Sequence, residues 1–209
     1  MTKKIYVIGD SISLHYGEFI IDALCDGFAY VPRENVKEAL ENINMAVGGN
    51  AGDSSRVLGL VKKQEEEGDI NNYDIILFNC GLHDIKRHPP KGTLQVEPEL
   101  YEKNLCEVLD ILKGHNVTPV FLTTTPVNDE IHHSYLEINN GIERFNKDVL
   151  EYNKIALGIM EKYKVAVIDL YNYTLAFGDA AYMDHVHYIT EVRKLQAEFI
   201  ANELDRLLG

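Results

Sequence analysis

The chain has 209 residues, of which 45% are hydrophobic and 25% are charged, and its formal net charge is −13. This composition is that of an ordinary folded protein, and the length suits one domain, 1–209, with a substantial core. The negative charge opposes binding to nucleic-acid phosphates and to anionic lipid, so we expect no nucleic-acid partner.

No apolar run approaches the ~18 residues that a membrane span needs, so we expect no membrane insertion. The apolar run at residues 5–9 is too short for a signal-peptide core, which predicts a cytoplasmic protein. Three cysteines without CxxC spacing predict free thiols and neither disulfides nor a cysteine metal site: Cys25, Cys80 and Cys106. The sequence indicates no cofactor and no oligomeric state.

The N-terminal half alternates predicted strands and helices. A buried strand over residues 3–8 ends abruptly at Gly9-Asp10-Ser11, and helical spacing follows over 14–30, up to Val31-Pro32. A short second strand is predicted at 43–47, before a glycine-rich loop at 48–52. Asp53 can cap a helix that runs to residue 67, and 74–80 is a third strand, apolar enough to be covered on both faces.

The second half repeats this alternation. Pro98 suits the first turn of a helix through residue 112, which is followed by a strand at 118–124 and a loop at 126–141. A long helix through 145–159, a strand at 165–170 and a last helix capped by Thr190 complete the chain. This order predicts a three-layer α/β/α sandwich around a mainly parallel five-stranded sheet, flavodoxin-like in arrangement. Because parallel strands end at one edge, we expect Ser11, the glycine-rich loop and His83 to gather there.

Ser11 alone is a weak signal, since Gly-Asp-Ser is also a common turn or helix cap. A partner for it lies before the last helix, in Asp184-His185-Val186-His187. An acid three residues before a histidine can bond the imidazole Nδ1 and leave Nε2 facing a serine hydroxyl. The alternative is that Asp184 caps a turn and both histidines are polar loop residues.

Taken with the glycine-rich loop and Gly81-Leu82-His83-Asp84, the order of these pieces resembles the GDSL, or SGNH, hydrolase family. The resemblance implies that Ser11 is the nucleophile, His187 the general base and Asp184 the residue that orients it. It also implies an oxyanion hole made by the Ser11 N–H, the Gly49 N–H and the side chain at position 83.

Position 83 departs from the family pattern, because His83 replaces an asparagine. A neutral imidazole presents one N–H and can replace an amide donor if its tautomer and reach are right. Among glycines 48, 49 and 52 the resemblance favours Gly49, because counting from Asn44 places it where the glycine of the family falls. Asn50 is a candidate substrate contact, although a turn role fits it equally.

Two further assignments concern repeated residue types. The second Gly-Asp-Ser, at residues 52–54, stands where a helix needs a cap, so we assign Ser54 to capping. His185 is the alternative general base, and the family spacing favours His187.

The resemblance implies a serine esterase that cleaves short acyl esters, with O-acetyl groups on carbohydrate as the suggested substrate. One rival is a metallohydrolase, because imidazoles and carboxylates also bind zinc or manganese. Its ligands would be His83, Asp84, Asp184, His185 and His187. The other rival is a non-catalytic binding protein on the same fold, for which the lost asparagine is the argument. We expect a serine enzyme without a metal.

Overall fold

The computed structural model describes residues 2–209 and has a five-stranded sheet at its centre. All four strand pairs are parallel, and the order across the sheet is β2-β1-β3-β6-β7. The strands are β1 (Lys3–Ile8), β2 (Phe28–Tyr30), β3 (Ile75–Phe78), β6 (Thr118–Leu122) and β7 (Ala166–Ile168). The predicted α/β fold with a parallel five-stranded sheet is therefore confirmed.

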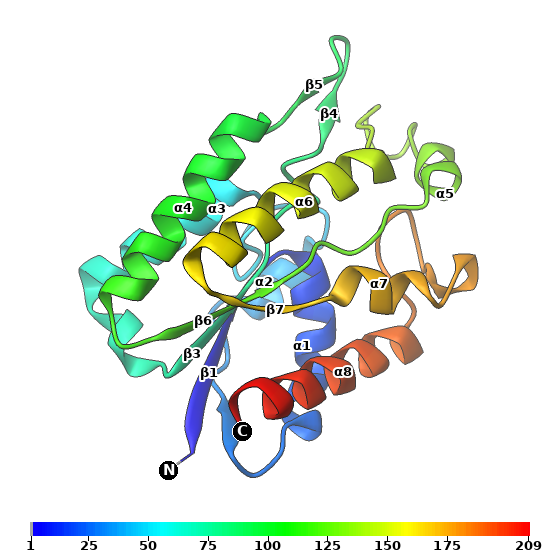
Figure 1. Ribbon diagram of the computed structural model, residues 1–209. Helices are drawn as coiled ribbons and strands as arrows, with labels where there is room; N and C mark the ends of the chain where they lie inside the picture. Colours follow the sequence, from blue (N-terminus) through cyan, green and yellow to red (C-terminus); the bar gives the residue numbers. More distant parts are fainter. Residues whose placement is uncertain (1) are drawn as a thin grey trace.

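Helices cover both faces of this sheet. Figure 1 shows α3 (Ser54–Glu67), α4 (Pro98–Gly114) and α6 (Asn146–Tyr163) on one side, with α1 (Ser11–Ala23) and α8 (Thr190–Leu208) together on the other. Because both faces are covered, every residue of the central strand β3 is buried. Within residues 2–209, no helix is both long and apolar enough to cross a membrane.

Shorter elements occupy the connections. They are α2 (Val36–Glu41), α5 (Asp129–Ser134), α7 (Leu170–Leu175), the 3₁₀ turns at Asp69–Asn72 and Asp179–Ala181, and a small hairpin of β4 (Arg87–His88) and β5 (Thr93–Leu94). Figure 1 shows this hairpin projecting beyond α4 and α6. Apart from the turn at Asp69–Asn72, which precedes β3, these connections follow the carboxyl ends of the strands.

Two predicted helix starts are confirmed by their local chemistry. Asp53 accepts a hydrogen bond from the Arg56 N–H at 3.0 Å and caps α3, while Pro98 is in the first turn of α4. Thr190 is the first residue of α8, and Ile189 is its cap residue, so the predicted cap is wrong by one position.

The predicted second strand is misplaced. Residues 43–47 form a turn and irregular backbone, and the second strand is β2, which pairs with β1 from Lys3 opposite Phe28. The apolar spacing that predicted a helix to residue 30 therefore spans both α1 and a strand. Gly27 lies in the turn between them, and the Lys3 N–H bonds its carbonyl at 2.9 Å. Edge pairing with β1 decides the conformation here, against the local helical pattern.

Short capped helices also replace predicted extended or loop segments. The strand predicted at 165–170 ends at Ile168, because the Asp169 side chain accepts the Asn172 N–H and starts α7. The loop predicted at 126–141 contains α5, where the Asn128 side chain accepts the Ile131 N–H. In both cases a single side-chain cap stabilises a six-residue helix that is too short to show periodicity.

Candidate active site

The turn from β1 into α1 presents Ser11 at the start of a helix. The Asp10 side chain accepts the Ile12 N–H at 3.0 Å and caps α1, so Ser11 is the first helical residue. First-turn N–H groups have no partner inside a helix, and the Ser11 N–H bonds no other group among residues 2–209. The turn therefore offers both a hydroxyl and an open backbone donor.

The loop before α8 brings the predicted histidine and aspartate to this serine. His187 Nε2 lies 2.9 Å from Ser11 Oγ, and His187 Nδ1 lies 2.7 Å from Asp184 Oδ2. A carboxylate accepts, so Nδ1 carries the hydrogen and Nε2 is left to accept the serine proton. The His187 ring is buried, and its edge-on contact with His15 at 5.0 Å restricts its motion further.

Asp184 is held in place by its own backbone neighbours. Its Oδ1 accepts the N–H groups of Val186 at 2.9 Å and His187 at 2.8 Å, while Oδ2 faces the imidazole. Partial burial raises the pKa of this carboxyl, but the hydrogen bonds from His187 and the loop outweigh it and lower the pKa below its ordinary value. Asp184 thus stays ionised and fixes the orientation of His187.

His185 points away from the serine. Its Nδ1 lies 3.2 Å from Nδ1 of His132 on α5, and its Nε2 lies 3.3 Å from Asn44 Oδ1. Burial lowers the pKa of His185 to about 3, which keeps it neutral. The structure therefore brings His187, and not the alternative base His185, to Ser11.

His83 follows β3 and is buried at the same edge. Its Nδ1 lies 2.9 Å from Lys86 Nζ, and its Nε2 makes no hydrogen bond to another residue within 2–209. Burial, then the nearby Lys86 charge, hold the pKa of His83 well below its ordinary value, so the imidazole is neutral. The charges of Arg144 and His187 also lower that pKa.

Asp84 has a structural partner. Its Oδ1 accepts the Ser54 N–H at 2.9 Å, so the loop that carries His83 is tied to the first turn of α3. The assignment of Ser54 to capping is wrong, because Asp53 is the cap of α3, and Ser54 is its first residue, whose Oγ accepts from Asn104 Nδ2 at 3.0 Å. Burial raises the pKa of Asp84 to about 7.

The glycine-rich loop does not present Gly49 as predicted. The Gly49 N–H is donated to the Asn35 carbonyl at 3.2 Å, so this donor is already occupied. The loop approaches the serine turn farther along, where the Ala51 N–H bonds the Gly9 carbonyl at 2.9 Å. Gly52, next to Ala51, is therefore better placed than Gly49, and its N–H bonds the Asn50 side chain at 3.0 Å.

The Asn50 side chain forms hydrogen bonds with backbone groups of this loop and of the turn before it. The residue is completely buried, its Oδ1 accepts the Gly52 N–H, and its Nδ2 lies 3.3 Å from the Ile43 carbonyl. Both ends of the amide are used inside the loop, so the structure favours the turn role that the sequence left open over a substrate contact.

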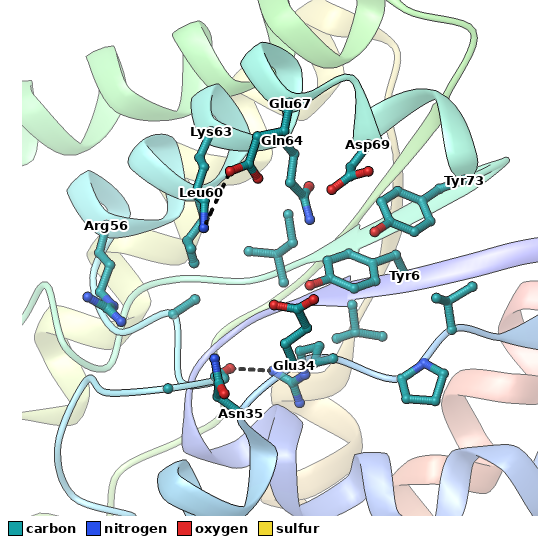
Figure 2. A pocket seen from close by; sticks show the side chains of 18 of the residues that line it. Tyr6, Glu34, Asn35, Arg56, Leu60, Lys63, Gln64, Glu67, Asp69 and Tyr73 are labelled. Atoms are coloured by element: carbon teal, nitrogen blue, oxygen red, sulfur yellow. Dashed lines mark hydrogen bonds and ion pairs between the residues drawn. The ribbon is translucent and has the colours of Figure 1, made fainter.

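A cavity of about 630 Å³ lies on the other side of the glycine-rich loop. Figure 2 shows its polar wall, with the stacked rings of Tyr6 and Tyr73 and the ion pair between Lys63 and Glu67. Gly48, Gly49 and Ala51 line it, whereas Ser11, His83 and His187 do not. Gly49 thus faces a space separate from the serine.

Two charged residues near the site were not predicted. Lys86 contacts His83, and Arg144, which is almost completely buried, donates from Nε to the Leu82 carbonyl at 2.7 Å. The spacing of Lys86, three residues after His83 in a turn, could have pointed to the first. Arg144 lies in an irregular segment before α6, and no sequence pattern marks it.

Residues 2–209 contain no group of three or more histidine, cysteine, aspartate or glutamate side chains arranged to hold a metal ion. The ligands of the predicted metal rival are engaged in hydrogen bonds to other protein groups. His187 pairs with Asp184, Asp84 accepts from Ser54, and His185 contacts His132.

Several solved structures share this fold at low sequence identity. A lipase/acylhydrolase from Enterococcus faecalis matches with a TM-score of 0.70 and 15% identity, covering 100% of this chain and 98% of that chain. The acetyl xylan esterase AlAXEase matches with a TM-score of 0.71 and 17% identity, covering 96% and 99%. A GDSL-like lipase from Bacteroides thetaiotaomicron matches with a TM-score of 0.67 and 12% identity, covering 99% and 89%.

No curated protein sequence matches the chain. The model of the GDSL-like Lipase/Acylhydrolase family matches residues 5–200, which is nearly the whole chain. Ser11, His83, Asp184 and His187 all fall inside the matched range. The chain therefore belongs to the GDSL-like lipase/acylhydrolase family.

Proposed function

We propose that this chain is a serine esterase that hydrolyses short-chain acyl esters through an acyl-enzyme. One observation carries the proposal: the unbroken hydrogen-bonded series from Asp184 through His187 to Ser11, at 2.7 and 2.9 Å. A serine hydroxyl is a weak nucleophile, and a neutral imidazole held in one tautomer by a carboxylate is the group that activates it.

Acylation begins when Ser11 Oγ attacks the ester carbonyl carbon and His187 Nε2 takes its proton. Asp184 stabilises the imidazolium that forms, and the carbonyl oxygen becomes an oxyanion. The carbon–oxygen bond to the leaving group then breaks, and His187 returns the proton to the departing alkoxide. Water next attacks the acyl-serine, giving its proton to His187, and the carboxylic acid leaves as Ser11 is reprotonated.

Two groups support the proposal as oxyanion donors. The Ser11 N–H is open at the helix start, and the neutral His83 has a free Nε2 at the same edge of the sheet. For the third donor we now favour Gly52, whose N–H would exchange the Asn50 side chain for substrate. This replaces the predicted Gly49, because the loop contacts the serine turn at Ala51, next to Gly52, whereas Gly49 contacts Asn35 and lines the separate cavity.

For the substrate we propose a short acyl group, with an O-acetyl ester of a carbohydrate first. The acetyl xylan esterase of similar fold supports this choice through its name alone. The edge of the sheet near Ser11 is rich in histidine and other polar groups, which suits a polar alcohol better than a long acyl chain.

The test is hydrolysis of a short aryl ester, an acetylated sugar and a long-chain acyl ester by wild type and Ser11→Ala. We expect turnover of the two short esters by wild type and none above background by the variant. Equal, negligible rates for both proteins would indicate a binding protein, and retained turnover in Ser11→Ala would refute the proposed nucleophile. A preference for the long-chain ester would refute the substrate assignment only.

A further inference from the structure

Lys86 lies beside His83 without an acidic partner of its own. Its ammonium is 2.9 Å from His83 Nδ1, and its backbone N–H bonds the His83 carbonyl at 3.3 Å. Among the ion pairs within residues 2–209, none involves Lys86. Lysine side chains usually reach water or pair with carboxylates. The contact of this ammonium with an imidazole is therefore unusual.

The contact with Lys86 fixes which nitrogen of His83 carries the hydrogen. An ammonium has three N–H donors and no acceptor, so Nδ1 of His83 must accept. A neutral imidazole carries one hydrogen, which is then on Nε2. Since Nε2 bonds no other residue within 2–209, its N–H remains available to a substrate oxygen.

We propose that Lys86 is a positioning residue that holds His83 in the Nε2–H tautomer and so makes the imidazole an oxyanion donor. This inference rests on the proposed esterase function. An asparagine amide always carries its N–H, whereas an imidazole can move its hydrogen to Nδ1 and turn a lone pair toward the oxyanion. Lys86 therefore keeps the hydrogen on Nε2, which an imidazole alone does not ensure and an asparagine amide does not require.

The surroundings of Lys86 set the pH range over which it can act. Burial, the largest effect, and the Arg144 charge together lower the pKa of Lys86 to about 8. Three acids oppose this from the N-cap of α1, the N-cap of α3 and the His83 loop: Asp10, Asp53 and Asp84. The charges of Arg144, His187 and Arg56, besides that of Lys86, act on His83. The donor should weaken as pH rises through about 8, because neutral Lys86 no longer requires Nδ1 to accept.

The kinetic test is a pair of substitutions in two backgrounds. In wild type, Lys86→Met should lower kcat at least about tenfold with little change in KM, and by no more than His83→Ala does. In a His83→Asn background the same change should alter kcat by less than about twofold, because an amide has no tautomer to fix. Lys91→Met, an exposed change in the neighbouring hairpin turn, is the control and should have no effect in either background.

Equal losses from Lys86→Met in the two backgrounds would overturn the proposal, since Lys86 would then act through the fold or through its charge. No loss in the wild-type background would overturn it as well. We also expect wild-type kcat to fall above pH 8 and the His83→Asn variant to lack that decline. The same high-pH decline in both proteins would contradict the assignment.

Nuclear magnetic resonance reads the tautomer without relying on turnover. The ¹⁵N shifts of the His83 ring in wild type should show hydrogen on Nε2 and none on Nδ1, and Lys86→Met should move part of the population to Nδ1–H. Hydrogen on Nδ1 in wild type, or an unchanged tautomer in the variant, would refute the role of Lys86. An inactive wild type with the expected tautomer would instead refute the esterase function.

Discussion

At the scale of single residues, the proposed donor role of His83 depends on its protonation state and its tautomer. Its burial keeps the ring neutral, and its Nδ1 contact with Lys86 leaves Nε2 as the donor. Loss of one oxyanion donor costs about 2.7–4 kcal/mol of barrier, so His83→Ala should lower kcat by roughly 10²–10³. His83→Asn should recover most of that loss, as measured with a short aryl ester.

The interpretation of His83 would be wrong if the alanine variant turned over as fast as wild type. Thermal unfolding of each variant is the control, because His83 is buried and its replacement can also change stability. Only a loss of kcat in a variant that remains folded bears on the donor role.

The second prediction at this scale concerns Asp184. An asparagine there can donate to Nδ1 of His187 and leave hydrogen on Nε2, which then cannot accept the serine proton. A change of this kind lowers kcat by about 10⁴ in a serine protease, and we expect a loss of that order from Asp184→Asn. Asp26→Asn, an exposed acid far along the chain, should leave kcat unchanged. Near-normal kcat in folded Asp184→Asn would remove Asp184 from the proposed mechanism.

At the scale of elements, the turn after β3 depends on Gly81. Its φ is +150°, and a Cβ there would lie 2.1 Å from Thr124 Oγ1, which itself donates to the Cys80 carbonyl. Strain and overpacking of this kind cost about 1–3 kcal/mol, so Gly81→Ala should lower the free energy of unfolding by that amount. Urea unfolding measures it.

Gly59 gives the matched control for that substitution. It lies inside α3, and a Cβ there would meet nothing within 4 Å. Alanine favours the helix interior over glycine by about 1 kcal/mol, so Gly59→Ala should raise the free energy of unfolding. Equal effects of the two substitutions would show that crowding at Gly81 does not determine the change in the free energy of unfolding of Gly81→Ala.

The elements also show what the sequence could predict. Long segments with regular periodicity, such as α4 and α6, were predicted with correct type, and so were the buried strands β1 and β3. The edge strand β2 was missed because its three residues gain their conformation from pairing with β1, which local spacing cannot report. The six-residue helices were missed because each depends on one cap or on tertiary packing.

At the scale of the whole molecule, stability should fall in mild acid. Burial lowers the pKa values of His15 and His185 to about 3 and of His132 to about 4, and it holds His83 well below its ordinary value. Below pH ~6.5 the unfolded chain binds protons on these histidines that the folded chain excludes, so the free energy of unfolding decreases as pH falls.

Two buried carboxyl groups act in the opposite direction. The pKa of Asp84 is raised to about 7 and that of Asp10 is also raised, both by burial, so they favour the folded state as pH falls. The four histidines outnumber them, and we expect the melting temperature to drop between pH 7 and pH 5. His15→Phe should reduce that drop. A melting temperature that rises over this range would contradict the prediction.

The site could be predicted where function depends on short motifs in a fixed order. Ser11, Asp184 and His187 lie together because the strands are parallel and end at one edge, which the alternation of elements already implied. The sequence could not show that the Gly49 N–H is occupied, because the carbonyl that accepts it belongs to Asn35, in a different part of the chain. Lys86 and Arg144 likewise act through contacts that only the folded chain creates.

The central claim is that His187 activates Ser11 as the nucleophile, and covalent labelling tests it most directly. A fluorophosphonate should react once per chain, and mass spectrometry should place the adduct on Ser11 as esterase activity disappears. Ser11→Ala should stay unlabelled, and His187→Ala should label far more slowly. An adduct on Ser54 of the second Gly-Asp-Ser, or full activity in a protein that resists labelling, would contradict the account.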